Sequence, residues 1–323
     1  MALIHSRQKI GIALAAIVTS VSLTSCSSEP PIAMPPAQIT RFVLDLSGSN
    51  DAVDQYDRLK PTIYQELKLA SVGNPYGSST NGPVDLSMTF IVGSASQARV
   101  ESILSSDFGF KLFEDIQKVY GRTSAQIAKD WPLVVAADAK AFDARYSGNQ
   151  SSCASEIYTT MKVNLGEEIS KEIAQRLCSR AIETIDVIER QIPASITKAS
   201  GSDVFGAFRE IDTWVEKTKS TKSDSKIKVV FASDMVHWTN GQRDLFGKNG
   251  LLTGKIGKAE IEAVAKEQAK LSSLKLEGVM VILIGRGNSS SVSADQGEAL
   301  AIFWKSFAEA SGFKLDTLTD GRA

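Results

Sequence analysis

The chain has 323 residues, with 36 basic and 37 acidic side chains and a formal net charge of −1. Hydrophobic residues make up 43% and charged residues 23%, a composition that excludes disordered and collagen-like chains. The near-neutral balance lacks the basic surface that nucleic acid requires, so we expect no nucleic-acid partner. Because the chain holds only two His and three Cys, we expect any metal ion to be held by oxygen atoms.

The first 25 residues have the three parts of an export signal. Arg7 and Lys9 precede an apolar run at residues 10–23, and small residues follow before Cys26. This arrangement is typical of a secretory signal peptide. The alternative is a short membrane anchor or a buried helix, but the run is shorter than the roughly 20 apolar residues that a spanning helix needs.

Residues 23–26, Leu-Thr-Ser-Cys, resemble the lipobox of bacterial lipoproteins. The resemblance implies cleavage before Cys26, acylation of its sulfur and amine, and anchoring in the cell envelope, at the outer membrane or cell surface depending on the host. More than one acyl chain gives the stable anchoring that a single chain does not. Residues 26–38 hold four of the nine prolines and predict an extended tether to a domain at 39–323.

Apolar strands alternate with helical segments along the rest of the chain. In chain order we expect a strand at 39–46, a helix at 51–71, strands at 84–92 and 98–103, a helical stretch, a helix at 203–218, a strand at 227–233, a helix at 258–274, a strand at 279–284, a helix at 294–310 and a strand at 313–318. Strands that are apolar along most of their length are typical of a parallel sheet covered on both faces. We therefore predict a doubly wound, mostly parallel, Rossmann-like α/β domain with a helical insertion at about 104–195.

Within the helical insertion, Leu133–Ala137 is the one candidate strand. The longest helix is expected at 167–192, with Gly166 and Pro193 as its boundaries. Cys153 and Cys178 are the cysteines that remain after lipidation at Cys26. Because disulfides persist outside the cytosol, we expect these two to pair; two separate buried thiols are the alternative.

Asp45, Ser47 and Ser49 stand at alternate positions where the first strand ends. Ligands of doubly wound sheets bind at the carboxyl ends of strands where the strand order reverses. Carboxylate and hydroxyl oxygens suit Mg²⁺, Mn²⁺ or Ca²⁺. The same residue types are also common in turns, so ordinary turn chemistry is the alternative.

Two later segments add oxygen atoms in the same structural context. Ser202 opens a helix, and Asp234 ends a strand. The ordered set resembles the von Willebrand factor type A (vWA) domain and its metal-ion-dependent adhesion site, over residues 39–318. By this resemblance Ser47 and Ser49 coordinate the metal directly, Ser202 takes a Thr position, and Asp45 and Asp234 bind directly or through water.

The resemblance further implies a divalent cation, with Mg²⁺ ahead of Mn²⁺ and Ca²⁺, and a protein partner whose acidic side chain fills an open position on the ion. The sequence departs from the family pattern at three places, of which the first concerns a ligand position and the last two the rim of the site. Ser202 replaces Thr, Met235 stands where many members have Gly, and the helical insertion is unusually long. All five oxygen positions remain filled.

His237 and Arg286 are the other chemistry-bearing residues near these strand ends. His237 with Ser47 or Ser202 would suggest a serine hydrolase, but no Gly-x-Ser-x-Gly elbow is present, so we favour a loop His packed beside Trp238. Arg286 lies in a Gly-rich turn, which is either an ordinary turn, a phosphate nest, or part of a rim that meets an acidic partner.

Together these observations predict an exported, membrane-anchored lipoprotein that is not an enzyme. Its vWA-like domain would bind a protein partner through a divalent cation, in adhesion or in assembly of an envelope complex. The alternatives are a solute-binding lipoprotein of a transporter and a serine hydrolase. The first requires two α/β lobes, whereas the sequence contains one set of apolar strands.

Overall fold

The computed structural model describes residues 36–46, 52–68, 84–91, 100–105, 107–146, 152–197, 201–237, 244–246, 250–252, 256–285 and 292–317. Six strands in these ranges form one sheet in the order β3-β2-β1-β4-β5-β6. They are β1 (Gln38–Asp45), β2 (Val84–Ile91), β3 (Val100–Leu104), β4 (Lys226–Ala232), β5 (Met280–Ile284) and β6 (Lys314–Thr317).

Every neighbouring pair of strands is parallel except β2 and β3, which are antiparallel at one edge. This confirms the predicted mostly parallel, doubly wound α/β sheet. The strand order reverses between β1 and β4, which is the switch point where ligands bind in sheets of this class. The order and directions of the strands fit a vWA-like fold.

The strands bury both faces because successive side chains point to opposite sides of the sheet. Phe42 and Leu44 of β1 belong to one core cluster, whereas Val43 between them belongs to the other. In β4, Val230 and Ala232 alternate in the same way with neighbours in the second cluster. Strands buried on both sides need apolar residues at nearly every position, which explains the continuous apolar runs in the sequence.

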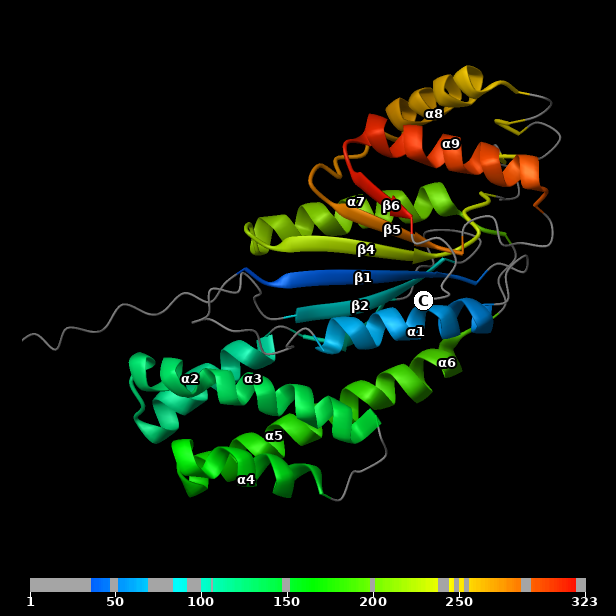
Figure 1. Ribbon diagram of the computed structural model, residues 1–323. Helices are drawn as coiled ribbons and strands as arrows, with labels where there is room; N and C mark the ends of the chain where they lie inside the picture. The colour runs from blue at the N-terminus through cyan, green and yellow to red at the C-terminus, as the bar shows by residue number, and fades with distance from the viewer. Residues whose placement is uncertain are drawn as a thin grey trace, which may run out of the picture. The chain divides into compact units, whose positions relative to one another are not determined.

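Helices cover each face of the sheet (Figure 1). The helix α1 (Ala52–Lys68) packs on β1 and β4 and contributes to the first cluster. The second cluster contains residues of α7 (Val204–Thr221), α8 (Lys258–Ser272) and α9 (Ala294–Ser311). Pro61 lies inside α1 without ending it.

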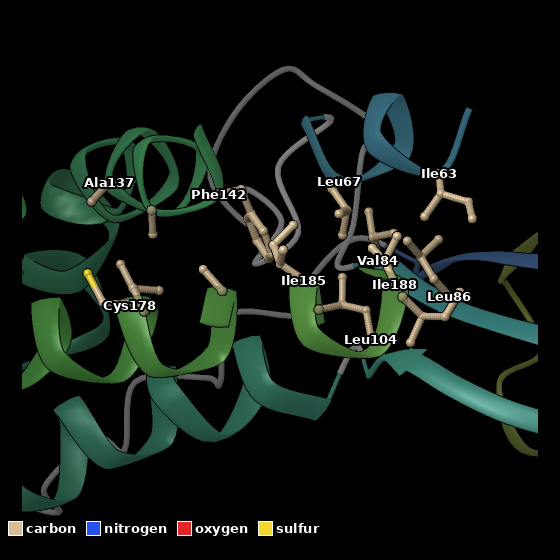
Figure 2. Packing of buried hydrophobic residues seen from close by; sticks show 14 of the residues in the cluster. Ile63, Leu67, Val84, Leu86, Leu104, Ala137, Phe142, Cys178, Ile185 and Ile188 are labelled. Atoms are coloured by element: carbon tan, nitrogen blue, oxygen red, sulfur yellow. The ribbon is translucent and has the colours of Figure 1, made fainter. Parts of the chain in front are cut away.

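The described part of the segment between β3 and α7 is mostly helical. It contains α2 (Asp107–Tyr120), α3 (Ser124–Tyr146), α4 (Cys153–Leu165), α5 (Glu167–Asp186), the π-helical turn η2 (Val187–Gln191) and α6 (Ile192–Ser195). We call this segment the helical lobe. Its apolar side chains belong to the same cluster as those of α1 and β2, and Figure 2 shows this core extending from Cys178 and Phe142 to Val84 and Leu86.

Two expectations about the helical lobe were wrong. Leu133–Ala137 lies within α3 and is no strand. Its local run of apolar residues suits a strand, but Val134 and Ala137 are buried in the first core cluster at helical spacing. Pro193 does not end the long helix, which continues to Ser195. The π-helical turn before it, with Ile192 N–H donating to Val187 O, accommodates the proline because it shifts the hydrogen-bond register.

The predicted disulfide between Cys153 and Cys178 is present and links the start of α4 to α5. The predicted signal peptide, Cys26 and most of the tether lie outside the described residues. In the ranges that the structure describes, every helix is too short or too polar to cross a membrane.

Candidate cation site

Asp45 is the last residue of β1, and its side chain is fully buried. Its Oδ2 atom accepts hydrogen bonds from the hydroxyl groups of Ser202 and Ser233, each at 2.7 Å. Leu44 pairs with Ala232, so Ser233 follows β4 at the level of Asp45 on the neighbouring strand. The fold thus gathers three polar side chains at the switch point between β1 and β4, and Asp45 is more than 150 residues from either serine in the sequence.

Ser202 is held in place by the start of α7. The next residue, Asp203, caps that helix, because its Oδ1 accepts a hydrogen bond from Gly206 N–H at 2.8 Å. Gly201, just before, has a φ of +87°, which a residue with a side chain rarely adopts. The turn into α7 therefore points the Ser202 hydroxyl at Asp45.

Both hydroxyl groups donate their only hydrogen to Asp45, which leaves oxygen lone pairs as acceptors. The Ser233 oxygen accepts a hydrogen bond from Met235 N–H at 2.9 Å, so this side chain ties Asp45 to the turn after β4. The Ser202 oxygen has no such donor among the described residues. Ser202 is therefore the hydroxyl better placed to serve as a ligand, and Ser233 is a bridging residue.

The turn after β4 places Asp234 beside this cluster in sequence and buries it completely. Its Oδ1 accepts a hydrogen bond from Val236 N–H at 3.0 Å, which forms a local turn. Met235 has a φ of +61°, the left-handed conformation that glycine favours, and its carbonyl accepts a hydrogen bond from Trp304 Nε1 at 3.0 Å. Met235 thus holds a left-handed backbone conformation at the turn after β4.

A second contact fixes the first turn of α1 near the carboxyl ends of the parallel strands, where Asp45 also lies. Gly285 follows β5 with a φ of +84°, and a Cβ atom added there would lie 2.6 Å from Gln55 Oε1. The Gln55 side chain is 4% exposed, and its Oε1 has no hydrogen-bond partner in the described structure. Residue 285 must therefore be small for Gln55 to pack as it does.

His237 is buried behind the cluster, with its ring 4.6 Å from that of Phe205. Its Nδ1 lies 3.8 Å from Asp203 Oδ1 and makes no hydrogen bond with any described residue. Burial lowers the pKa of His237 from 6.5 to about 4, although the nearby Asp203 carboxylate opposes this shift. The imidazole is neutral near pH 7, and the hydroxyls of Ser202 and Ser233 donate to Asp45 and not to it.

The chemistry of these donors fits a hard divalent cation. Two buried carboxylates and the hydroxyl groups supply only oxygen atoms, which Mg²⁺, Mn²⁺ and Ca²⁺ prefer. Within the described ranges, no group of three or more His, Cys, Asp or Glu side chains is arranged to hold a metal ion. A cation held by Asp45 and Asp234 would therefore depend on hydroxyl groups as well.

The predicted site residues have different outcomes. Asp45 and Ser202 are brought into direct contact, and Asp234 follows Ser233 at the same strand end. Ser47, Ser49, Trp238 and Arg286 lie outside the described residues, so their predicted roles stay predictions. Ser233 is not among the predicted site residues. The pairing of Leu44 with Ala232 identifies it, because it places Ser233 level with Asp45 on the adjacent strand.

Comparisons with known proteins do not place the chain in a family. No family model matches it, and no curated protein gives a significant match. Among solved structures, the human COPII-coat protein Sec24c matches with 12% sequence identity and a TM-score of 0.30, over 89% of this chain and 30% of that chain. The chain thus spans less than a third of that protein. At this identity and TM-score the match supports no conclusion about the fold or function of the chain. The class assigned to the fold rests on its strand order.

Proposed function

We propose that this protein is a membrane-anchored binding protein of the cell envelope, and that its vWA-like domain holds a divalent cation through which a protein partner binds. The observation that carries the proposal is the pair of hydrogen bonds from Ser202 and Ser233 to Asp45 at the switch point of the sheet. Ligands bind at this place in open α/β sheets. The described residues there, Asp45, Ser202, Ser233 and Asp234, supply oxygen atoms, and the two serine hydroxyl groups donate to Asp45 and not to His237.

In this proposal Asp45, Ser202 and Asp234 hold the ion, together with Ser47 and Ser49 as the sequence predicts. Mg²⁺ is expected first, with Mn²⁺ and Ca²⁺ as alternatives. When bound, the ion offers a ligand position that an acidic side chain of the partner fills. Ser233 orients Asp45, and the buried Asp203 cap keeps the Ser202 hydroxyl directed at the same carboxylate.

The direction of β1 fixes the end of the sheet at which the candidate cation site lies. The described chain enters the sheet at Gln38, and Asp45 lies at the opposite end of the same strand. Eight residues of strand separate the two ends by about 23 Å. The candidate cation site therefore lies at the end of β1 opposite to the residue where the described chain enters the sheet.

Calorimetric titration of Mg²⁺ and Mn²⁺ into chelator-treated protein tests the site. We expect Asp45→Asn and Ser202→Ala to weaken affinity about tenfold or more, because each removes a ligand oxygen or its charge. Asp224→Asn is the matched control, since Asp224 is an exposed carboxylate in the turn before β4, away from the site. Equal affinity in wild type and Asp45→Asn would overturn the cation assignment.

A second experiment tests the partner. The lipidated protein is crosslinked in the native envelope and recovered with and without a chelator. We expect a captured protein that is lost with chelator and in the Asp45→Asn variant. Capture that ignores both, or an ester hydrolase activity that His237→Ala abolishes, would contradict a binding role through the ion.

A further inference from the structure

A hollow separate from the candidate cation site lies between α1 and the helical lobe. Its volume is about 660 Å³. Small-molecule sites have volumes of roughly 300–1,000 Å³ and occur preferentially where two structural units meet. We call it the lobe cavity, and residues of α1, α3 and the π-helical turn η2 line it.

The lobe cavity has an apolar wall. Leu67 from the last turn of α1 and Phe142 from the last part of α3 both line it, and both are anchored in the first core cluster. Figure 2 shows these two side chains among the residues that join the helices. Pro61 adds a further apolar surface on α1. This wall can bury the apolar body of a ligand.

The charged groups of the lobe cavity are mostly acidic. Lys60 Nζ lies 3.1 Å from Asp57 Oδ1 and 3.6 Å from Glu189 Oε2, so one ammonium group forms ion pairs with two carboxylates. Tyr64 donates a hydrogen bond of 2.5 Å to Glu189 Oε1, which fixes that carboxylate on the π-helical turn. Asp143 has no ion pair or hydrogen bond with any described residue.

The charges therefore do not balance inside the lobe cavity. Three carboxylates, from Asp57, Asp143 and Glu189, face one ammonium, from Lys60, which leaves a net charge of −2. A ligand that complements this surface has a positive charge at one end and an apolar body. An anion would meet the same carboxylates with repulsion.

We propose that the lobe cavity binds a small organic amine. Its ammonium group lies near Asp143 and Glu189, and its aliphatic or aromatic body lies against Leu67 and Phe142. The π-helical turn is part of the site because it carries Glu189, and such turns occur frequently at functional sites. This binding activity is additional to the proposed cation site and does not depend on it.

Titration followed by calorimetry and by two-dimensional NMR tests the proposal, with hexylamine as the probe and hexanoate as a control of the same length and opposite charge. We expect hexylamine to bind and to shift signals of Leu67 and Phe142, and hexanoate not to. A lysine-containing tripeptide forms a second arm: stronger binding of hexylamine than of the peptide identifies a free amine as the ligand, as proposed. Stronger binding of the peptide would overturn the assignment of a free amine as the ligand.

Variants locate the binding. Asp143→Asn should weaken hexylamine affinity about two- to fivefold, and the double variant with Glu189→Gln about tenfold, as expected for partly exposed charge pairs. Glu260→Gln, an exposed position on α8, is the matched control. Glu189→Gln loses part of the contact with Tyr64, so circular dichroism checks its fold, whereas Asp143→Asn disturbs no described contact.

Unchanged affinity in Asp143→Asn, or equal binding of hexylamine and hexanoate, would overturn the lobe cavity assignment. The hexylamine titrations are run in chelator and repeated in the Asp45→Asn variant, whose Mg²⁺ binding is measured separately without chelator. Loss of Mg²⁺ binding with hexylamine binding intact would separate the two sites, and the reverse result would reject the amine site alone.

Discussion

His237 makes the stability of the fold depend on pH over a defined range. The buried imidazole has a pKa of about 4 in the folded chain and an ordinary value of 6.5 when exposed. Between these two values the unfolded chain binds a proton that the folded chain does not. Stability should therefore be unaffected by His237 above about pH 6.5 and should fall as the pH drops toward 4, where the loss levels off.

The size of the effect follows from the two pKa values. The full gap between 6.5 and about 4 corresponds to about 3 kcal/mol of unfolding free energy. At about pH 5 the unfolded state is almost fully protonated and the folded state almost fully neutral, which gives about 2 kcal/mol. Because the side chain is only 1% exposed, solvent screens this effect little.

Urea denaturation of wild type and His237→Leu at about pH 7.5 and about pH 5, in chelator, measures the effect. The quantity of interest is the difference between the unfolding free energies of the two proteins, because pH effects that they share cancel in it. We expect that difference to move by about 2 kcal/mol in favour of the variant at the lower pH. A difference in unfolding free energy that changes by less than about 0.5 kcal/mol between the two pH values would refute the argument that burial holds the imidazole neutral.

Three further changes test the packing. Gly285→Ala should lower the unfolding free energy by about 1–2 kcal/mol because of its left-handed backbone, and Gln55→Ala in the same chain should relieve only the steric contact; a neutral Gly285→Ala would contradict this. Reducing the Cys153–Cys178 disulfide should cost about 3 kcal/mol in urea denaturation, with the double Ser variant insensitive to reductant. Trp131→Ala, at a fully buried position, should cost about 3–5 kcal/mol, and a loss below about 1 kcal/mol would mean that the site can collapse.

Much of the fold could be predicted because the strands that form the core are continuous apolar runs in the sequence. Val229 and Val230 are both fully buried, on opposite faces, and such continuous apolar runs are typical of a parallel sheet. The secondary structure of the helical lobe was harder to predict, because a short apolar run can belong to a buried helix or to a strand. The run Leu133–Ala137 suits a strand by its apolar residues alone, and the packing of α3 against α4 and α5 shows that it is helical.

The candidate site was predictable to the extent that strand ends are. Asp45 and Asp234 could be placed at one edge because parallel strands end together, and Ser202 because it opens the next helix after the lobe. The bridging role of Ser233 needed the register of β1 and β4. The state of His237 needed its surroundings, since sequence gives no measure of burial by Phe205.

The helix α1 joins the two proposed binding sites, and its contacts argue that they act independently. It follows the segment that carries Ser47 and Ser49, and it lines the lobe cavity with its later turns. Its first turn is fixed twice, by Gln55 against Gly285 and by a 2.5 Å hydrogen bond from the Tyr56 hydroxyl to Ile188 O of the π-helical turn.

A helix fixed to both the sheet and the lobe has little freedom to carry a movement from one site to the other. Coupling between two ligands is reciprocal, so one titration measures it. We expect the hexylamine affinity with saturating Mg²⁺ to stay within about twofold of its value in chelator. A change of about tenfold would show instead that α1 moves when the cation binds, and that the contacts of Gln55 and Tyr56 yield to it.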